Sequence, residues 1–584
     1  MIGRTLLAAL FCALFMAAAP VTEKPNVLLV TIDTWRTDYI SASGSAKVKT
    51  PFLDRMAAEG LYIPKVETPA PSTTPGHASI LTGLYPRNHE IRDNIHFRLK
   101  AGARTIAEDF RDRGYRTVAV VSGAPLKKIY GLSKGFDIYD DSGFGVEGED
   151  AIVPASRDGS ESARKALEYS SRNEGRSLFI WLHLYDPHMP YMPPREFAEM
   201  YPRDLYAGEV AYCDSILGGF VRKLLETKKG RWIVVITGDH GEGLGDRGES
   251  THSILLYKET REVPLIIWDS AGRPAKPFRR QHSLIDIYPT IAAISSLAPR
   301  PCDGISIFST GSERWLYSES LIPTMNFGLN PAFSAQKNGK IFIKHGTSDE
   351  LYSDGDERND TARSDPAFAR LAGGEIKRFF GENNSYSSNL KLSAEEMRTL
   401  ASLGYLGSAT QDVFRSSPCD LRAFAADFSD TITSARAENA RGNFAAALRL
   451  YDRAVKKYGG SAILRLERGS VLVGLNRFDE ARAEFLECLK LDRNNSVAML
   501  NLGNIMMMKG KQPEAEKLYL SSLAAEEQQP EAHLNLGILY SKKPEKRQDA
   551  VRHLGRFLEL APPGDPDAKN VADLIRKLGG VPKP

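Results

Sequence analysis

Two apolar segments of this chain end in residues that could hold a metal ion. Asp33 follows the run from Val27 to Ile32, and Asp239 and His240 follow the run from Trp232 to Ile236. A lone carboxylate just past a buried strand is more often a turn or cap residue. Here an acid, an imidazole and glycine-rich backbone occur together, which suits a divalent cation and a closely approaching anion. The two segments therefore predict one metal site at strand ends.

Thr73 is the candidate nucleophile. Pro75 fits the first position of a helix that runs through Ala78 to Leu81, so the Thr73 hydroxyl is expected just ahead of that helix. The unpaired N–H groups and the positive dipole end of a helix favour a tetrahedral oxyanion at that place. A bound cation would lower the pKa of the hydroxyl and activate it. The alternative is that Thr73 only caps a helix in a Ser/Thr-rich loop.

The elements that must position these residues alternate between strands and helices from Asn26 to about Leu406. Strands are predicted at Val27 to Ile32, Thr117 to Val121, Leu178 to Leu184, Trp232 to Ile236 and Leu265 to Trp268. Helices are predicted at Pro51 to Ala58, Thr105 to Arg113, Ser162 to Tyr169 and Val210 to Leu225. This alternation predicts an α/β domain with a mainly parallel sheet between helices. Its site should lie at the carboxyl ends of the strands.

After about Asp420 a 34-residue period replaces this alternation. Gly469, Gly503 and Gly537 are 34 residues apart, as are Ala447, Ala481 and Ala515. A small residue at this period, where two helices touch, resembles tetratricopeptide repeats and predicts an all-α solenoid. Such a solenoid offers a concave surface that usually binds a protein or peptide. The alternative is an extension that serves only stability.

The N-terminus indicates export. Arg4, an apolar run from Leu6 to Met16 and the segment Ala17 to Pro20 have the form of a secretory signal. The run is too short for a stable membrane span, so a periplasmic or secreted protein is expected. The net charge of +3 among 584 residues does not indicate nucleic acid as a partner. The widely spaced cysteines form no zinc pattern.

The segment from Pro71 to Gly83 resembles the active-site signature of sulfatases in the alkaline phosphatase superfamily, C/S-x-P-x-R-x-x-x-L-T-G. Thr73 stands where that signature has Cys or Ser, and His77 stands where it has Arg. Sulfatases oxidise the Cys or Ser to formylglycine, but a Thr carries a methyl group on Cβ and cannot yield the aldehyde. No formylglycine is therefore expected. Thr-x-Pro-x-His looks instead like the nucleophile segment of nucleotide phosphodiesterases in this superfamily.

The resemblance implies a metal site held by Asp33, Asp239 and His240, with the Thr73 oxygen beside or on the metal. Most sulfatases have a second acid where this chain has Thr34, and Asn where it has His240. In this respect the candidate ligands of this chain are similar to those of phosphonate monoester hydrolases and of single-metal phosphoethanolamine transferases. One divalent ion is expected. An imidazole ligand favours zinc or manganese over calcium, which is still possible.

The resemblance also implies roles for residues outside the metal site. His188 lies in a segment similar to the sulfatase D-P-H-x-P-Y motif, and His252 stands where relatives keep Lys or His. Both are expected to bind the anion or to act as general acids. His77, Asn94 and Lys127 are the candidates for substrate binding.

The activity implied is hydrolysis or transfer of phosphate or phosphonate esters through a covalent Thr73 intermediate. Small-molecule, envelope or glycan esters are the expected substrates. Two alternatives remain open: a sulfuric ester hydrolase, and an inactive sulfatase-like scaffold. The expected organisation is a signal peptide at 1–20, a sulfatase-like catalytic domain at 22–408, a linker at 409–428 and the repeats at 429–580.

Overall fold

The computed structural model describes residues 24–144, 156–172, 175–278, 281–298, 300–327, 329–353, 356–381, 385–390, 413–415, 420–458, 461–527, 529–561, 565 and 567–582. The expected signal peptide lies outside these residues. Among the residues described, no helix has both the length and the apolar character that crossing a membrane requires.

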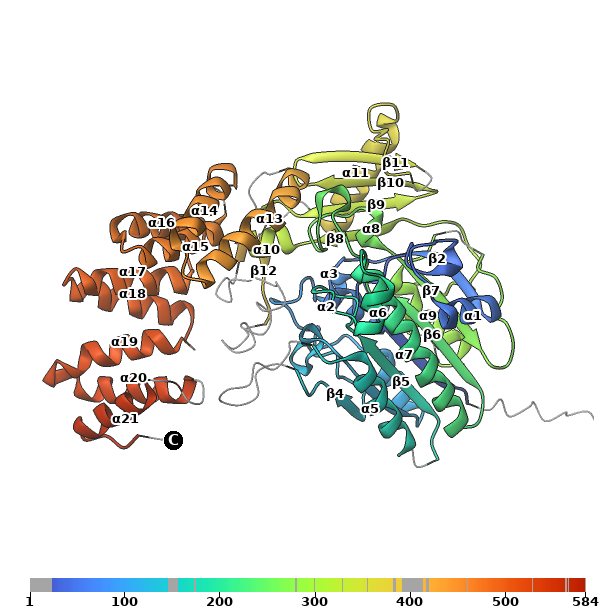
Figure 1. Cartoon of the computed structure of the whole chain (residues 1–584), viewed down its shortest axis with the longest axis horizontal. Helices are drawn as coiled ribbons and strands as arrows, with labels where there is room; N and C mark the ends of the chain where they lie inside the picture. The colour runs from blue at the N-terminus through green and yellow to red at the C-terminus, as the bar shows by residue number, and fades with distance from the viewer. Residues whose placement is uncertain are drawn as a thin grey trace, which may run out of the picture.

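A seven-stranded sheet forms the centre of the N-terminal part (Figure 1). Its order is β2-β7-β6-β1-β5-β3-β4, and the pairs β6-β1, β1-β5, β5-β3 and β3-β4 are parallel. The predicted mainly parallel sheet is therefore confirmed, with antiparallel pairing confined to β7 and its two neighbours. The strands are β1 (Asn26–Ile32), β2 (Leu61–Glu67), β3 (Arg116–Val120), β4 (Ile138–Asp140), β5 (Leu178–Leu184), β6 (Trp232–Gly238) and β7 (Glu262–Asp269).

Helices cover both faces of this sheet, because alternate residues of the fully buried strands point to opposite sides. Leu29 and Trp181 face a core that includes α2 (Thr73–Thr82), α4 (Ile106–Asp112) and α9 (Ile287–Ile294). Val30 and Leu182 face the other core, with α1 (Pro51–Glu59), α5 (Gly159–Ser171) and α7 (Leu205–Thr227). The shorter helices are α3 (Pro86–His89), α6 (Arg195–Met200), α8 (Lys258–Arg261) and α10 (Ile322–Phe327).

A second sheet follows that the sequence analysis did not predict. Its antiparallel order is β11-β10-β9-β8, and α11 (Pro366–Phe380) packs on it. The strands are β8 (Leu316–Ser320), β9 (Ala332–Lys337), β10 (Lys340–His345) and β11 (Ser348–Ser353); the short β12 (Ser385–Ser387) and β13 (Val413–Arg415) pair separately. Asn338 and Gly339 connect β9 to β10 with positive φ angles of 53° and 76°. Asn-Gly is the preferred pair for such a hairpin turn, so the signal was present in the sequence.

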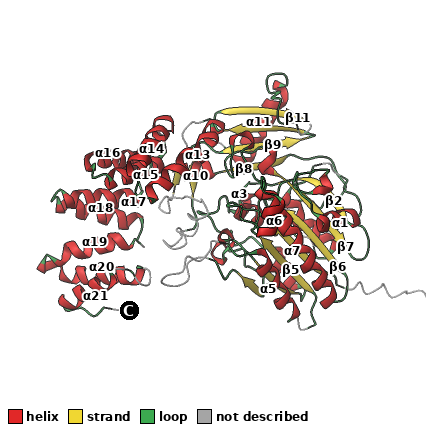
Figure 2. Cartoon of the chain, viewed as in Figure 1, coloured by secondary structure: helices red, strands yellow, loops and turns green. Residues whose placement is uncertain are grey.

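The C-terminal part is an arc of paired helices, which Figure 2 separates from the strand-containing part. Its helices are α13 (Leu421–Ala440), α14 (Phe444–Tyr458), α15 (Ala462–Gly474), α16 (Phe478–Leu491), α17 (Ser496–Met508), α18 (Gln512–Ala525), α19 (Pro530–Ser541), α20 (Arg547–Leu560) and α21 (Ala568–Lys577). A Cβ added at Gly469 or Gly503 would lie 2.6 or 2.4 Å from the ring of Phe485 or Tyr519 on the paired helix. This close packing explains the 34-residue period and confirms the predicted solenoid.

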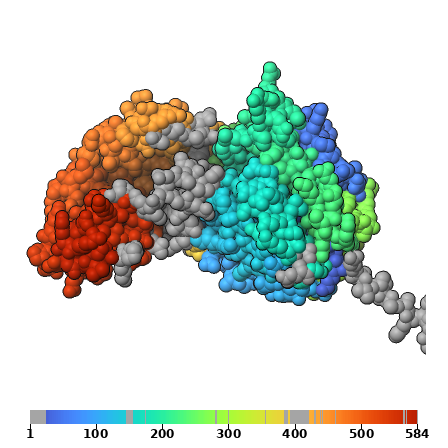
Figure 3. All heavy atoms as spheres, turned by 60° about the horizontal axis from the view of Figure 1, so that its bottom comes forward, coloured from blue at the N-terminus to red at the C-terminus, as the bar shows by residue number. Residues whose placement is uncertain are grey.

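The first helix of the arc, α13, begins at Leu421, inside the segment expected to be a linker. It packs on the N-terminal part, so that one end of the arc meets that part and the other curves away (Figure 3). Glu350 is central to the contact. Its carboxylate accepts hydrogen bonds from Arg422 on α13 (2.8 Å), from Tyr257 (2.9 Å) and from His345 (3.1 Å).

Glu350→Gln is expected to lower the thermal unfolding midpoint near neutral pH by about 2–4 °C. Burial alone would raise the pKa of Glu350, but the His345 and Tyr257 hydrogen bonds and the Arg422 charge lower it to about 2, from 4.5. Because the folded-state pKa is depressed, this contribution is present above about pH 4.5 and is lost as the pH falls towards 2. Midpoints of both proteins measured from pH 7 to 2 should therefore converge. A gap that does not change with pH would contradict the assignment.

Candidate active site

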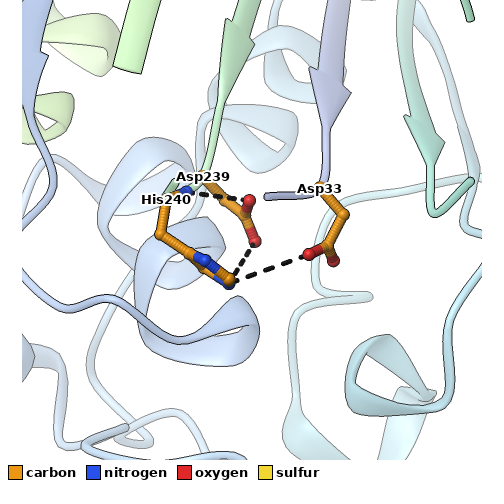
Figure 4. A group of neighbouring side chains, drawn as sticks. All are labelled: Asp33, Asp239 and His240. Atoms are coloured by element: carbon orange, nitrogen blue, oxygen red, sulfur yellow. Dashed lines mark hydrogen bonds and ion pairs between the residues drawn. The ribbon is translucent and has the colours of Figure 1, made fainter. Parts of the chain in front are cut away.

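The candidate metal ligands lie at the ends of two neighbouring strands (Figure 4). β1 and β6 are parallel and in register, with Ile32 opposite Gly238, so Asp33 and Asp239 emerge side by side at the carboxyl edge of the sheet. Asp33, Asp239 and His240 are fully buried, and one ligand atom from each lies within 4.8 Å of the others. The His240 Nε2 atom is 3.5 Å from Asp239 Oδ2 and 3.7 Å from Asp33 Oδ1.

Each of these three side chains points one unpaired atom at the others. Asp33 Oδ1, Asp239 Oδ2 and His240 Nε2 are buried and have no hydrogen-bond partner among the described residues. The remaining polar atoms are engaged: His240 Nδ1 donates to the Gly241 carbonyl at 2.9 Å, and Asp239 Oδ1 accepts from the His240 N–H at 2.8 Å. Buried unpaired acceptors are costly, and two oxygens with one imidazole nitrogen fit a divalent cation.

The charges of the cluster support the same fit. Burial raises the pKa of Asp33 and of Asp239, and the neighbouring Asp33 carboxyl group raises the pKa of Asp239 further. Burial also lowers the pKa of His240, so its imidazole is neutral. A neutral imidazole can act as a ligand, and a cation would compensate the buried carboxylates. The three side chains therefore form a possible metal site.

His183 on β5 fixes the orientation of the Asp33 carboxylate through a hydrogen bond. The Ser122 N–H donates to His183 Nδ1 at 3.2 Å, so the ring carries its proton on Nε2. This Nε2 lies 3.3 Å from Asp33 Oδ2 and donates to it, which leaves Oδ1 turned towards the cluster. His183 was not among the site residues expected from the sequence. The geometry gives it the position of an outer-shell partner of a metal ligand.

His183→Phe is expected to weaken metal binding about 10–100-fold, because Asp33 loses the donor that fixes its rotamer. His183→Gln, which can still donate from its amide, should retain more of the affinity. Competition with a metal-chelating dye would measure both variants. Equal affinity of His183→Phe and the unmodified chain would show that the Asp33–His183 contact does not support the site.

Thr73 is brought to this cluster by helix α2. The Thr73 side chain is fully buried and hydrogen bonded with Asp33. A Cβ added at Gly76 would lie 2.9 Å from the Asp239 carbonyl oxygen, so the first turn of α2 packs directly on the end of β6. The helix begins at Thr73, with Ser72 as its N-cap, two residues earlier than the position of Pro75 had suggested. A proline is tolerated anywhere in the first turn, where N–H groups lack partners, so its position does not fix the start of a helix.

His77 lies beneath Thr73 with both ring nitrogens engaged. The Trp181 indole N–H donates to Thr31 Oγ1 at 3.0 Å, and this hydroxyl lies 2.9 Å from His77 Nε2. His77 Nδ1 lies 2.7 Å from the Thr73 carbonyl oxygen. Burial lowers the pKa of His77, so the ring is neutral. This geometry fits a role for His77 in supporting the Thr73 backbone better than the role in substrate binding that was expected from the sequence.

His252 and His188 lie next to the metal cluster. The His252 ring is 4.4 Å from the His240 ring and 5.1 Å from the His188 ring, between centroids. Although burial works against it, Glu242 raises the pKa of His252, whose Nδ1 is 3.1 Å from Glu242 Oε1. Burial lowers the pKa of His188 to about 3. Of the two rings, His252 is therefore the one that holds a proton more readily.

Asn94 and the segment just before Lys127 both contact Thr74 at the start of α2. Asn94 Oδ1 accepts from the Thr74 N–H at 2.8 Å, and its Nδ2 is buried with no partner among the described residues. Thr74 Oγ1 donates to the Pro125 carbonyl at 2.7 Å, two residues before Lys127. The structure thus brings Asn94 close to Thr73. Lys127 is linked to the start of α2 through the contact between Pro125 and Thr74.

Sequence reasoning missed Glu242 and Ser253. Glu242 comes two residues after His240, so its closeness in the sequence to a predicted ligand was a usable signal. Ser253 has a positive φ of 81°, rare for a residue with a side chain. Its hydroxyl donates to the Pro71 carbonyl at 2.8 Å and lies 2.8 Å from Ser72 Oγ. No sequence pattern indicates that contact.

Comparison with known proteins gives a matching family model for each part of the chain. The Sulfatase model matches residues 25–296, and the Tetratricopeptide repeat model matches 432–496 and 466–532. The multifunctional alkaline phosphatase superfamily protein PehA of Trinickia caryophylli is 25% identical over 49% of this chain and 76% of its own length. An arylsulfatase of Clostridium perfringens is 24% identical over 50% of this chain and 79% of its own length.

Solved structures agree on the fold. The crystal structure of Ps i-CgsB in complex with k-i-k-neocarrahexaose matches with a TM-score of 0.51 and 18% identity, over 65% of this chain and 98% of that chain. With these matches added to the sheet and the repeat helices, the chain carries a sulfatase-family domain of the alkaline phosphatase superfamily at its N-terminus and tetratricopeptide repeats at its C-terminus, and the sulfatase relatives support an ester hydrolase of that family.

Proposed function

We propose that this hydrolase cleaves phosphate or phosphonate esters through a covalent intermediate on Thr73. The observation that supports the proposal is the hydrogen bond between the Thr73 hydroxyl and Asp33, within the cluster of Asp33, Asp239 and His240. These three side chains would hold one divalent cation, with the Thr73 oxygen beside it, and the imidazole ligand favours zinc or manganese. Such a cation lowers the pKa of a hydroxyl and polarises a phosphoryl oxygen.

In the first step the Thr73 oxygen forms a bond to phosphorus while the bond from phosphorus to the leaving oxygen breaks. The hydroxyl proton leaves to water, and protonated His252 donates its proton to the leaving oxygen. Neutral His188 and Asn94 Nδ2 surround the transferred group. In the second step water attacks phosphorus while the bond from phosphorus to the Thr73 oxygen breaks. One proton of that water passes to neutral His252, and the Thr73 oxygen takes back a proton from solvent.

The side chain at position 73 distinguishes between phosphorus and sulfur. The Thr73 methyl group prevents formation of an aldehyde, so the hemiacetal route by which formylglycine enzymes expel sulfate is closed. A phosphothreonine can still be resolved at phosphorus by water or by an acceptor alcohol. Sulfuric ester hydrolysis is the second candidate function, favoured by the arylsulfatase relative.

Two measurements test the proposal. The first is turnover of 4-nitrophenyl phosphate, a 4-nitrophenyl phosphodiester, a 4-nitrophenyl phenylphosphonate and 4-nitrophenyl sulfate. The second is mass spectrometry of protein quenched during turnover, which should show one phosphoryl group on Thr73. Robust sulfate turnover without any phosphoryl activity would refute the preference for phosphorus.

Other parts of the assignment are also proposals. The first residues direct export to the periplasm or the medium, where envelope or glycan esters are available as substrates. The repeats at 429–580 bind a protein or peptide partner, and the catalytic domain spans 22–408. Pull-down with and without the repeat surface tests partner binding. Fractionation of expressing cells tests export.

A further inference from the structure

We propose that helix α13, the first helix of the repeat arc, is a positioning element of the active site. It acts on the loop from residue 241 to residue 257, here named the His252 loop, which carries Glu242 and His252. The inference rests on the proposed function, because that function gives His252 its role.

The backbone of the His252 loop touches α13 directly. A Cβ added at Gly248 would lie 2.9 Å from the Ala426 Cβ, so the two elements approach without space for a further methyl group. Gly248 also has a positive φ of 83°. Leu255 and Leu256 of the loop and Leu421 and Phe424 of α13 belong to one buried apolar cluster. The contact is therefore a shared core and not a flexible tether.

Polar contacts join the same two elements. The Leu256 N–H donates to His345 Nε2 at 2.9 Å, and His345 Nδ1 is hydrogen bonded with Glu350 at 3.1 Å. Arg422 on α13 donates to Glu350 at 2.8 Å and to Ser348 Oγ at 2.7 Å. The β10–β11 hairpin thus contacts both the loop and α13.

The His252 loop is held together by hydrogen bonds of its own, so a displacement of Gly248 would also displace His252. The Gly243 N–H donates to the Thr251 carbonyl at 2.5 Å, across the base of the loop. The Glu249 carboxylate accepts from the N–H groups of Ile254 at 2.7 Å and Leu255 at 3.1 Å. These bonds tie the part of the loop that touches α13 to the part next to His252.

The loop also contacts the nucleophile segment. The Ser253 hydroxyl donates to the Pro71 carbonyl and lies beside Ser72 Oγ, the residue before Thr73. Ser320 on β8 donates in turn to the Ser253 carbonyl. A continuous set of contacts therefore leads from α13 through the His252 loop to the start of α2. Displacements of about 1 Å in such supports can lower a rate by about 100-fold.

The test enlarges the side chain at the contact. Ala426→Phe is expected to lower kcat by at least about 10-fold with little change in KM, because His252 is displaced while the substrate pocket persists. Ala426→Ser, which is nearly isosteric, should keep the kcat of the unmodified chain. Ala426 and Ala445 are both exposed, so Ala445→Phe on α14 is the matched control for adding a ring to an exposed helix position. Turnover is followed with the 4-nitrophenyl ester that the unmodified chain hydrolyses best.

Amide hydrogen exchange gives a readout that does not depend on activity. In Ala426→Phe, exchange should rise in residues 244–257 and not in β1 or β6, whereas Ala445→Phe should leave the loop protected. If Ala426→Phe does not fold, Arg422→Gln, with a side chain 42% exposed, tests the same contact. Equal kcat and equal loop exchange in the Ala426 and Ala445 variants would overturn the inference. Full activity of Thr73→Ala would instead overturn the proposed function.

Discussion

Thr73→Val is expected to lower turnover of phosphoryl esters by about 10³-fold or more, because it removes the attacking oxygen and keeps the shape of the side chain. Thr73 is fully buried at the first position of α2, so the two methyl groups of valine fit where one methyl and one hydroxyl were. Steady-state kinetics on the 4-nitrophenyl esters measure the loss. Mass spectrometry of the quenched variant should show no phosphoryl group.

Thr73→Ser is the matched control, because it keeps the oxygen and deletes only the methyl group. It should retain measurable turnover and form the covalent intermediate on the new serine. Metal content separates two roles of the hydroxyl: Thr73→Val should still bind metal, since Asp33, Asp239 and His240 remain. Turnover by Thr73→Val within 10-fold of the unmodified chain would show that Thr73 is not the nucleophile.

The positions of the metal cluster could be predicted because they follow from local rules. Val27 to Ile32 is apolar except for Thr31, which indicates a strand buried on both faces, and parallel strands end at one edge of a sheet. Asp33 and Asp239 therefore had to meet if β1 and β6 were neighbours, as they are. Thr73 followed from the resemblance of its segment to a nucleophile loop.

The residues that orient the cluster could not be predicted, because their contacts join positions far apart in the chain. His183 and Asp33 are 150 positions apart and meet only because β5 pairs with β1. Ser253 and Ser72 are 181 positions apart, and no motif links the two. Serine and histidine occur in many environments, so residue type alone does not distinguish an outer-shell partner from an ordinary core residue.

The repeat period predicted the helix pairs but not their attachment to the catalytic domain. Glycine recurs every 34 residues because each pair has the same internal contact. Ala426 and Gly248, where α13 meets the His252 loop, occur once and give no periodic signal. A helix in a region expected to be a linker is also not indicated by composition. A repeat period shows the contacts that all repeats have in common. It does not show the contacts that only the first helix, α13, makes.

Asp239→Asn is expected to reduce bound divalent metal from about one ion per chain to less than about 0.1, with an activity loss of about 10³-fold. Asparagine can keep the Oδ1 contacts with the N–H groups of His240 and Thr34, at 2.8 and 3.3 Å. Its Nδ2 replaces the unpaired Oδ2 that faces His240, so one ligand is lost without a change in size. Elemental analysis of the purified proteins measures the metal.

Asp246→Asn is the control, since Asp246 lies on the same loop with a side chain 52% exposed and outside the cluster. It should keep its metal. Equal metal content in Asp239→Asn and Asp246→Asn would contradict the site.

Thermal unfolding should show opposite effects of Asp239→Asn with and without metal. Burial, and then the neighbouring Asp33, raise the pKa of Asp239, so in a chelator its ionised form is disfavoured in the folded state at neutral pH. A neutral asparagine removes that cost, and the metal-free variant should be at least as stable as the metal-free unmodified chain. With metal at about 100 times its Kd, the unmodified chain gains about 2.7 kcal/mol and the variant gains little. This reversal distinguishes a metal site from a structural carboxylate, whose replacement would destabilise the protein in both conditions.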